Sequence, residues 1–395
     1  MKLKSIKEAD IGNKKVLLRI DINSPIANGK VLDSPRFRES AETIKYLLKN
    51  KARLVIIAHQ GRKGDKDFLS LKQHAKIISK YVGREINYVD DLFGSLALNK
   101  IRKLDSGEAI ILKNVREYED EINISKKENR YIAFCKEFDI YVNDAFSACH
   151  RKQGSIIIPP RYLLGYIGFG VEKELSALKN FEIKNKTCVY LIGGNKIEDY
   201  FAIFNKLKNR KNKLLASGVL ANLLLVAKGY NLGYENNWLR ENGYLKLIPR
   251  LKQVCKKYAK QIILPVDFAF DINGRKEFSV EKAPFRNKIY DVGHETVKIF
   301  RKNLMHSRAI FMKGPLGFSE MPMASYATIA ILNEISNLSR KRKIFSLLGG
   351  GHLTTTISKY KIPDNFSHIS LSGGALIAYI SGEKLPGLEA LKNSR

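Results

Sequence analysis

Short runs of β-branched and apolar residues alternate along the chain with segments whose apolar residues recur at helical spacing. Alternation of this kind is typical of parallel sheets that helices cover on both faces. The sequence therefore predicts an α/β fold with parallel sheets. The predicted strands are residues 15–22, 53–58, 108–112, 139–142, 188–192, 213–216, 261–266, 309–312 and 343–348.

A glycine-rich turn passes into a helical pattern before the middle of the chain. Glycines are frequent over residues 165–170, and Val171, Leu175 and Leu178 then recur at helical spacing. We place a domain boundary here, with a helix over 171–185 as a stiff connector. The predicted strands before and after this segment would then belong to separate sheets.

The length and charge of the chain limit the possible domain organisation and binding partners but do not decide the function. A chain of 395 residues, 44% of them hydrophobic, is long enough for two domains with separate cores. The net charge of +30 favours an anionic partner, whether nucleic acid, membrane headgroups or phosphorylated metabolites. The four cysteines lack a metal-binding spacing, and no segment has the pattern of a signal peptide or a membrane span. We therefore expect a cytoplasmic protein with no membrane partner. We also expect a monomer, although the sequence itself leaves the oligomeric state open.

Basic residues follow the first four predicted strands, where an open α/β sheet binds its ligands. Arginine suits bidentate capture of carboxylates and phosphates, so a small, doubly anionic substrate fits such a pocket. Each arginine alone is more often a surface residue, but their recurrence at strand ends favours a shared site. Asp21 and Asn23 could orient substrate hydroxyls. The candidate residues are Asp21, Asn23, Arg36, His59, Arg62, Arg116, His150 and Arg151.

Glycine turns replace arginine after the later strands. The stretch 188–208 has the pattern of strand, glycine turn and helix, and the turn carries Lys196 after Gly193 and Gly194. Backbone N–H groups at such a turn favour an anion, and a lysine adds a movable charge. A plain βα turn with an exposed lysine is the competing interpretation. Several such turns together indicate a nucleotide surface, and the others contain Gly314 with Glu320, and Gly349, Gly350 and Gly351 with His352.

Motifs in both halves resemble those of phosphoglycerate kinases, in the family's order and over essentially the whole chain. In the first half RIDINSP, AHQGR, LKNVREY and YVNDAFSACHR resemble the family's RVDFNVP, SHLGR, LENVRF and YVNDAFGTAHR. In the second half LIGGNKIED, GPLGFSE and GEKLPGLEAL resemble ILGGAKVED, GPMGVFE and GKKLPGVEAL. Each match is short, but so many in order are specific.

The resemblance implies two Rossmann-like three-layer α/β/α lobes with parallel sheets, joined by a helix and a hinge. Residues 1–170 with a returning tail, 384–395, would bind phosphoglycerate, and residues 186–383 would bind ATP or ADP with Mg²⁺ on the phosphates. The implied reaction is reversible phosphoryl transfer between 1,3-bisphosphoglycerate and ADP. The substrate residues are those named above, Arg36 and Lys196 correspond to catalytic residues, and Glu320 corresponds to the carboxylate that holds the ribose.

The chain departs from the family pattern mainly in its second half. His352 stands where the family's GGGD has an aspartate, Lys313 replaces an asparagine, and Tyr200 replaces a lysine. These changes leave the metal ligand open, and we expect Lys313 to compensate phosphate charge in place of the missing lysine. An activity-impaired relative, or a nucleic-acid-binding protein on the same fold, is the alternative. The basic residues are spread along the chain without a nucleic-acid motif, which argues against the second.

Overall fold

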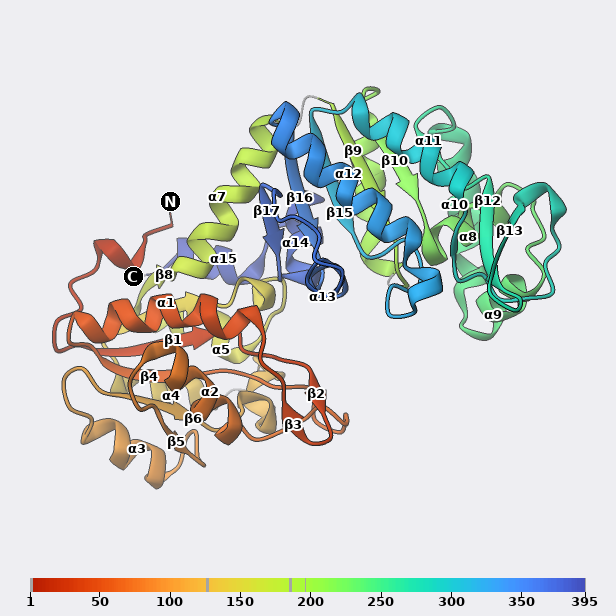
Figure 1. Cartoon of the computed structure of the whole chain (residues 1–395). Coiled ribbons are helices and arrows are strands. Elements are labelled where there is room, and N and C mark those ends of the chain that lie inside the picture. Colours follow the sequence, from red (N-terminus) through yellow and green to blue (C-terminus); the bar gives the residue numbers. More distant parts are fainter. Residues whose placement is uncertain (1–2, 126–127, 185–186, 196, 395) are drawn as a thin grey trace. The chain divides into compact units, whose positions relative to one another are not determined.

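The computed structural model describes residues 3–125, 128–184, 187–195 and 197–394. The chain forms two compact units, Met1–Ser176 with Gly382–Arg395, and Ala177–Ser381 (Figure 1). Helix α7 (Phe169–Lys184) contains the point at which the chain passes from the first unit to the second. Across the described residues, no helix is both long and apolar enough to cross a membrane.

The first unit is built on a six-stranded sheet in which all neighbouring strands are parallel. Two of its strands are buried at every residue, which shows that both faces of the sheet are covered, as parallel sheets require. In spatial order the strands are β5 (Asn87–Val89), β6 (Ala109–Leu112), β4 (Arg53–Ile57), β1 (Lys15–Ile20), β7 (Ile140–Asp144) and β8 (Leu164–Ile167).

Amphipathic helices cover this sheet. In α1 (Pro35–Lys49) the proline occupies the first turn, where its missing N–H leaves no hydrogen bond unmade, and Phe37, Ala41 and Leu48 share the buried face. The remaining elements of the unit are the hairpin β2 (Ile26–Ala27) and β3 (Lys30–Val31), the helices α2 (Lys72–Val82), α3 (Ser95–Arg102), α4 (Arg130–Phe134), α5 (Gly154–Ile157) and α6 (Pro159–Tyr162), and the 3₁₀ turns Ile6–Glu8, Val115–Glu117, Glu119–Glu121, Cys135–Glu137 and Phe146–Ala148.

The end of the chain returns to the first unit. Helix α15 (Pro386–Lys392) packs against β8, α5 and α6. The Gly387 N–H donates to the Cys149 carbonyl over 2.9 Å, and a Cβ at Gly387 would lie 2.7 Å from Ile156. Glycine therefore allows the tail to approach the body of the unit closely.

The second unit contains another six-stranded parallel sheet and a small antiparallel sheet. In spatial order the large sheet consists of β11 (Ile262–Ile263), β10 (Lys213–Ala216), β9 (Cys188–Ile192), β15 (Ala309–Lys313), β16 (Phe345–Gly349) and β17 (His368–Ser370). The small sheet has the order β13 (Arg275–Ser279), β12 (Asp267–Asp271) and β14 (Asp291–Val292).

An apolar cluster joins the two sheets to helices of the second unit. Phe268 and Phe270 of β12 pack with Met312 of β15 and Phe300 of α11 in this cluster. The helices are α8 (Gly218–Ala227), α9 (Tyr234–Glu241), α10 (Ile248–Lys257), α11 (His294–Met305), α12 (Tyr326–Arg342), α13 (Gly351–Lys359) and α14 (Gly373–Ile380), with 3₁₀ segments η6 (Glu198–Lys208), η7 (Tyr244–Leu247), η8 (Val280–Lys282) and η9 (Pro322–Ala324).

The predicted parallel α/β architecture is confirmed in both units, with strands 188–192 and 213–216 at their predicted bounds. The prediction for 261–266 was wrong in extent: only Ile262–Ile263 joins the parallel sheet, and the chain beyond Pro265, which lacks a ladder N–H, turns into the antiparallel sheet. Residues 164–167 form a strand where we expected a turn.

Candidate functional site

Arginine side chains of the first unit gather around His59. The pKa of His59 lies well below its usual value, first because the ring is buried and then because nearby guanidinium groups oppose a further positive charge. These groups belong to Arg19, Arg116, Arg151 and Arg36. Such a concentration of cations costs stability, and a bound anion would relieve their repulsion. The arrangement is therefore typical of an anion site.

Arg62 and Arg116 belong to the same group. Burial lowers the pKa of Arg116 to about 10, and the charges of Arg151, Arg19 and Arg62 contribute to that shift. Arg116 also donates to the Gly61 carbonyl, which fixes the turn after β4. Arg62 itself is exposed. The structure thus brings together every arginine that we selected in the first half.

Asp21 and Asn23 are held at the end of β1. Asp21 forms an ion pair with Arg36 and accepts a hydrogen bond from the Ser147 hydroxyl. Asn23 accepts from the Gly61 N–H over 2.9 Å. The acidic group therefore orients one arginine of the cluster instead of neutralising the site, and Asn23 ties two strand-end loops together.

The tautomer of His59 follows from its partner Arg19. A guanidinium nitrogen of Arg19 lies 3.0 Å from His59 Nδ1, and a guanidinium can only donate. Nδ1 must accept, so the proton of the neutral ring is on Nε2. His59 can thus donate a hydrogen bond to an anion without carrying a charge. Arg19 is fixed in turn by Ser155 Oγ at 3.0 Å.

His150 and Arg151 lie together after β7. Arg151 Nε is 3.2 Å from His150 Nε2, and both side chains are partly buried. The positive charge of Arg151 is one of those that lower the pKa of His59, so Arg151 belongs to the same cluster.

Sequence reasoning assigned no role to Arg19 or Ser147, although both contact predicted site residues. Arg19 has 0% exposure within β1, and a charged residue inside the apolar run 16–20 is a signal that could have found it. Its buried counterpart is Glu121, which accepts from Ser155 Oγ over 2.8 Å. Burial raises the pKa of Glu121, while the charge of Arg19 lowers it.

The second unit has a cavity of about 460 Å³, a size common for small-molecule sites. Its buried end contains Phe268, Asn222 and Glu235, and its exposed end contains Glu320 and His352. The other lining residues are Gly194, Asn195, Gly218, Val219, Trp238, Lys288, Ile289, Tyr290, Asp291, Val292, Pro315, Leu316, Gly317 and Phe318.

Glycine turns at the ends of β9 and β15 touch directly beside this cavity. The Gly193 N–H donates to the Lys313 carbonyl over 2.8 Å, and a Cβ at Gly193 would lie 2.1 Å from the Pro315 carbonyl oxygen. Gly314 has φ +75°, which favours glycine. Of the predicted nucleotide residues, Gly194, Glu320 and His352 line the cavity. Gly193 and Gly314 follow β9 and β15, and Gly349, Gly350 and Gly351 lie where β16 passes into α13.

Two departures from the family pattern have partners within the unit. Lys313 is 7% exposed, and its Nζ donates to the Gly373 carbonyl over 3.2 Å. His352 Nδ1 lies 2.6 Å from Glu320 Oε1. Burial alone would raise the pKa of Glu320, but hydrogen bonds from its own backbone and from His352 lower it. Glu320 is thus held as a carboxylate at the cavity mouth.

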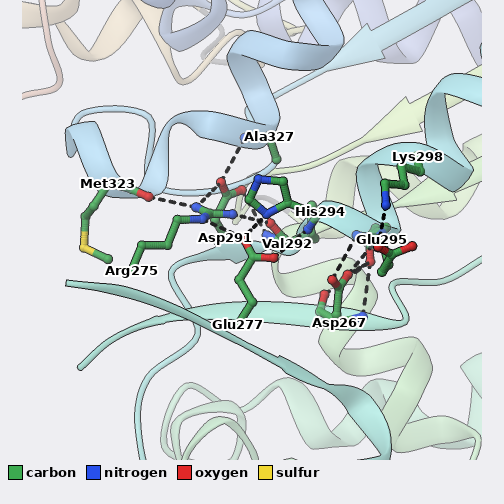
Figure 2. A network of polar contacts seen from close by, with 11 residues as sticks. Asp267, Arg275, Glu277, Asp291, Val292, His294, Glu295, Lys298, Met323 and Ala327 are labelled. Carbon is green, nitrogen blue, oxygen red and sulfur yellow. Dashed lines mark hydrogen bonds and ion pairs between the residues drawn. The ribbon is translucent and has the colours of Figure 1, made fainter. Parts of the chain in front are cut away.

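A polar network fixes one wall of the cavity (Figure 2). Arg275 donates to the Asp291 carboxylate over 3.0 Å and to the Met323 carbonyl over 2.8 Å. The Ala327 N–H donates to the same carboxylate over 3.0 Å. Burial raises the pKa of Asp291 to about 7, although these donors and the charge of Arg275 lower it. The network joins β13, β14 and α12 and holds Asp291 in the cavity wall.

Lys196, a predicted catalytic residue, lies outside the described residues. Within the described part of the chain, no three His, Cys, Asp or Glu side chains form a group that could hold a metal.

An arginine cluster in one α/β unit and a cavity of about 460 Å³ beside glycine turns in another are typical of a small-molecule phosphotransferase. The family model described as phosphoglycerate kinase matches residues 6–383. The chain belongs to the phosphoglycerate kinase family, whose members are transferases with a carboxyl group as acceptor.

Relatives and solved structures agree with this assignment over nearly the whole chain. The phosphoglycerate kinase of Sulfolobus acidocaldarius is 38% identical, covering 98% of this chain and 95% of the relative. That of Methanothermus fervidus is 36% identical, covering 100% and 98%. The crystal structure of the Pyrococcus horikoshii enzyme has a TM-score of 0.91 at 32% identity, covering 99% of this chain and 98% of that one. These relatives lend no support to the nucleic-acid alternative.

Proposed function

We propose that the chain transfers a phosphoryl group between 1,3-bisphosphoglycerate and ADP, giving 3-phosphoglycerate and ATP. Residues 1–170 with 384–395 would bind the glycerate and residues 186–383 the nucleotide. The arginine cluster around His59 carries the proposal, because it matches a substrate with anionic groups at both ends. The glycine turns beside the cavity support the nucleotide half.

The reaction requires no general base. The glycerate oxygen that attacks or leaves is a carboxylate, and carboxyl groups have pKa values of about 4, so it is ionised near neutral pH. Catalysis then depends on positioning and on charge stabilisation in the transition state. Arg36 is oriented by Asp21 for this role, and neutral His59 donates from Nε2 without exchanging a proton.

We assign to Lys196 the stabilisation of negative charge on the transferring phosphoryl group, because of its place in the family motif. Arg36 would stabilise charge on the glycerate side. A Mg²⁺ ion on the nucleotide phosphates would neutralise part of their charge. Glu320 would hold the ribose at the cavity mouth, and Gly194 would offer backbone to the phosphates.

The two ligands belong to different units, whereas reacting atoms must come within roughly 3 to 3.5 Å. We therefore propose a hinge closure at residues 165–170 and α7, which would also exclude water from the acyl phosphate. A monomer in the cytoplasm suffices for this mechanism.

The test is a coupled assay of ATP formation from 1,3-bisphosphoglycerate that depends on ADP and Mg²⁺. Arg36→Ala and Lys196→Ala should each lower kcat by about 10²-fold or more, since each removes a charge-stabilising group. The matched control is Arg84→Ala, an exposed arginine outside the cluster. Absence of ATP formation by the parent protein, or equal rates for parent and Arg36→Ala, would refute the proposal.

A further inference from the structure

The buried end of the cavity holds one polar pair among apolar side chains. Asn222 is 5% exposed and Glu235 is 6% exposed, and both line the cavity beside Phe268 and Val292. They come from consecutive helices, α8 and α9. Polar groups in such a position need hydrogen-bond partners, so each of their polar atoms can be accounted for in turn.

Glu235 has its acceptor capacity directed to two donors. Its Oε1 accepts from the Ile289 N–H over 2.9 Å, and its Oε2 accepts from Asn222 Nδ2 over 3.1 Å. Burial raises the pKa of Glu235, while the Ile289 N–H, the charge of Lys288 and the Asn222 amide lower it. As a carboxylate Glu235 only accepts, and it faces the nitrogen of the Asn222 amide. Glu235 therefore fixes which way the amide of Asn222 points.

The oxygen of the Asn222 amide is the polar atom of this pair that still needs a hydrogen-bond partner. Asn222 Oδ1 is buried and has no hydrogen-bond partner among the described residues. A buried polar atom without a partner costs free energy, and in the lining of a cavity a bound ligand can supply that partner. The missing partner is a hydrogen-bond donor, because the oxygen of an amide can only accept.

We propose that Asn222, oriented by Glu235, reads the six-position of the nucleotide base and selects adenine over six-oxo purines. This inference rests on the proposed function, which places a nucleotide in the cavity. The phosphates belong at the glycine turns and Glu320 lies at the exposed end, so the base occupies the apolar, buried end. Adenine presents an amino group to an acceptor there, whereas guanine and hypoxanthine present a carbonyl oxygen.

The same geometry makes Glu235 a positioning residue, because it sets which end of the Asn222 amide faces the base. Glu235→Gln should therefore change the base preference. In Glu235→Gln, the new amide can keep the Ile289 contact through its oxygen and donate to Asn222 Oδ1 through its nitrogen. The Asn222 amide would then turn and offer Nδ2, a donor, to the base. A preference for adenine would become a preference for six-oxo purines.

The test measures dissociation constants by calorimetry for ADP, purine riboside 5′-diphosphate, IDP and GDP. With the unmodified protein, removal of the amino group should weaken binding about tenfold, and the six-oxo nucleotides should bind at least as weakly. Four constants within twofold of one another would overturn the proposal. This comparison needs no variant to fold.

In Glu235→Gln the ratio of the GDP constant to the ADP constant should fall by about tenfold or more. Glu241→Gln removes the same charge from an exposed position of the same helix, and its ratio should stay at the parent value. An unchanged ratio in a folded Glu235→Gln protein would overturn the positioning role of Glu235.

Turnover separates this inference from the proposed function. Selective ADP binding without ATP formation would refute the proposed reaction and support base reading by Asn222. Normal ATP formation with equal affinities for all four nucleotides would do the reverse. If no nucleoside diphosphate binds, both are overturned.

Discussion

The carboxyl group of Asp144 should make the stability of the first unit depend on pH. Asp144 is 6% exposed at the end of β7, and its Oδ1 accepts from the Val171 N–H of α7 over 3.2 Å. Its Oδ2 has no hydrogen-bond partner among the described residues. Burial raises the pKa of Asp144 to about 7, although hydrogen bonds from Thr43 and from the first turn of α7 lower it.

The size of this pH effect on the free energy of unfolding follows from the difference in the pKa of Asp144 between the folded and unfolded protein. The unfolded group has a pKa of about 4, so between about pH 4 and 7 the folded protein binds more protons than the unfolded chain. The free energy of unfolding therefore falls as pH rises through this window, by at most about 1.4 kcal/mol per unit. A shift of about three units sets an upper limit of about 4 kcal/mol for the cost of ionised Asp144 above pH 7.

Asp144→Asn keeps the oxygen that accepts from Val171 and removes the ionisation. In urea unfolding followed by circular dichroism, it should be more stable than the parent at pH 8, and the difference should shrink by pH 5. The single tryptophan, Trp238, reports separately on the second unit by fluorescence. Asp105→Asn, at an exposed carboxylate, is the control and should show no such trend. A difference for Asp144→Asn that is equal at both pH values would refute the reasoning.

Two further predictions concern the nucleotide half. Lys313→Ala should raise the apparent KM for ADP about tenfold, because a buried cation beside the glycine turns compensates phosphate charge. Lys302→Ala, at an exposed lysine, is the control and should leave the KM unchanged. An unchanged KM in Lys313→Ala would exclude that role. Gly193→Ala should lower the free energy of unfolding by about 1–3 kcal/mol in thermal or urea unfolding, because its Cβ would lie 2.1 Å from the Pro315 oxygen. Gly12→Ala, whose Cβ would have its nearest neighbour at 4.0 Å, is the control. Equal stabilities of the two variants would contradict the close packing at Gly193.

Strand periodicity predicted much of the arginine site, because the carboxyl ends of parallel strands lie at one edge of a sheet. Arg36, Arg116 and Arg151 are far apart in sequence, yet all three influence the pKa of His59. Strands of three residues, such as β5 and β17, escaped prediction because they are too short for a periodic pattern. The antiparallel sheet escaped because its pairing depends on contacts distant in sequence.

The polar partners of the site residues could not be predicted for a related reason. Asn222 belongs to an apolar helix, and its pattern alone indicates a core position. Asn222 becomes a candidate ligand-binding residue only in the packed structure. There Glu235 of α9 lies within 3.1 Å of its Nδ2, and its Oδ1 has no partner among the described residues. Sequence spacing predicts which residues share a strand end, whereas a buried hydrogen-bond account requires the packed helices.

The pairing of Glu320 with His352 explains why this chain can depart from the family at one position while keeping the other. An aspartate at 352 could place a second carboxylate close to Glu320 Oε1, which lies 2.6 Å from the histidine, and like charges at that range oppose ionisation. The histidine instead donates to Glu320 and helps to lower its pKa. His352→Asp should therefore raise the pKa of Glu320 and weaken ADP binding at low pH, measured by calorimetry between pH 5 and 8. His306→Asp, at an exposed histidine outside the cavity lining, is the control. ADP affinities with the same pH dependence in His352→Asp and the parent would show that the two positions act independently.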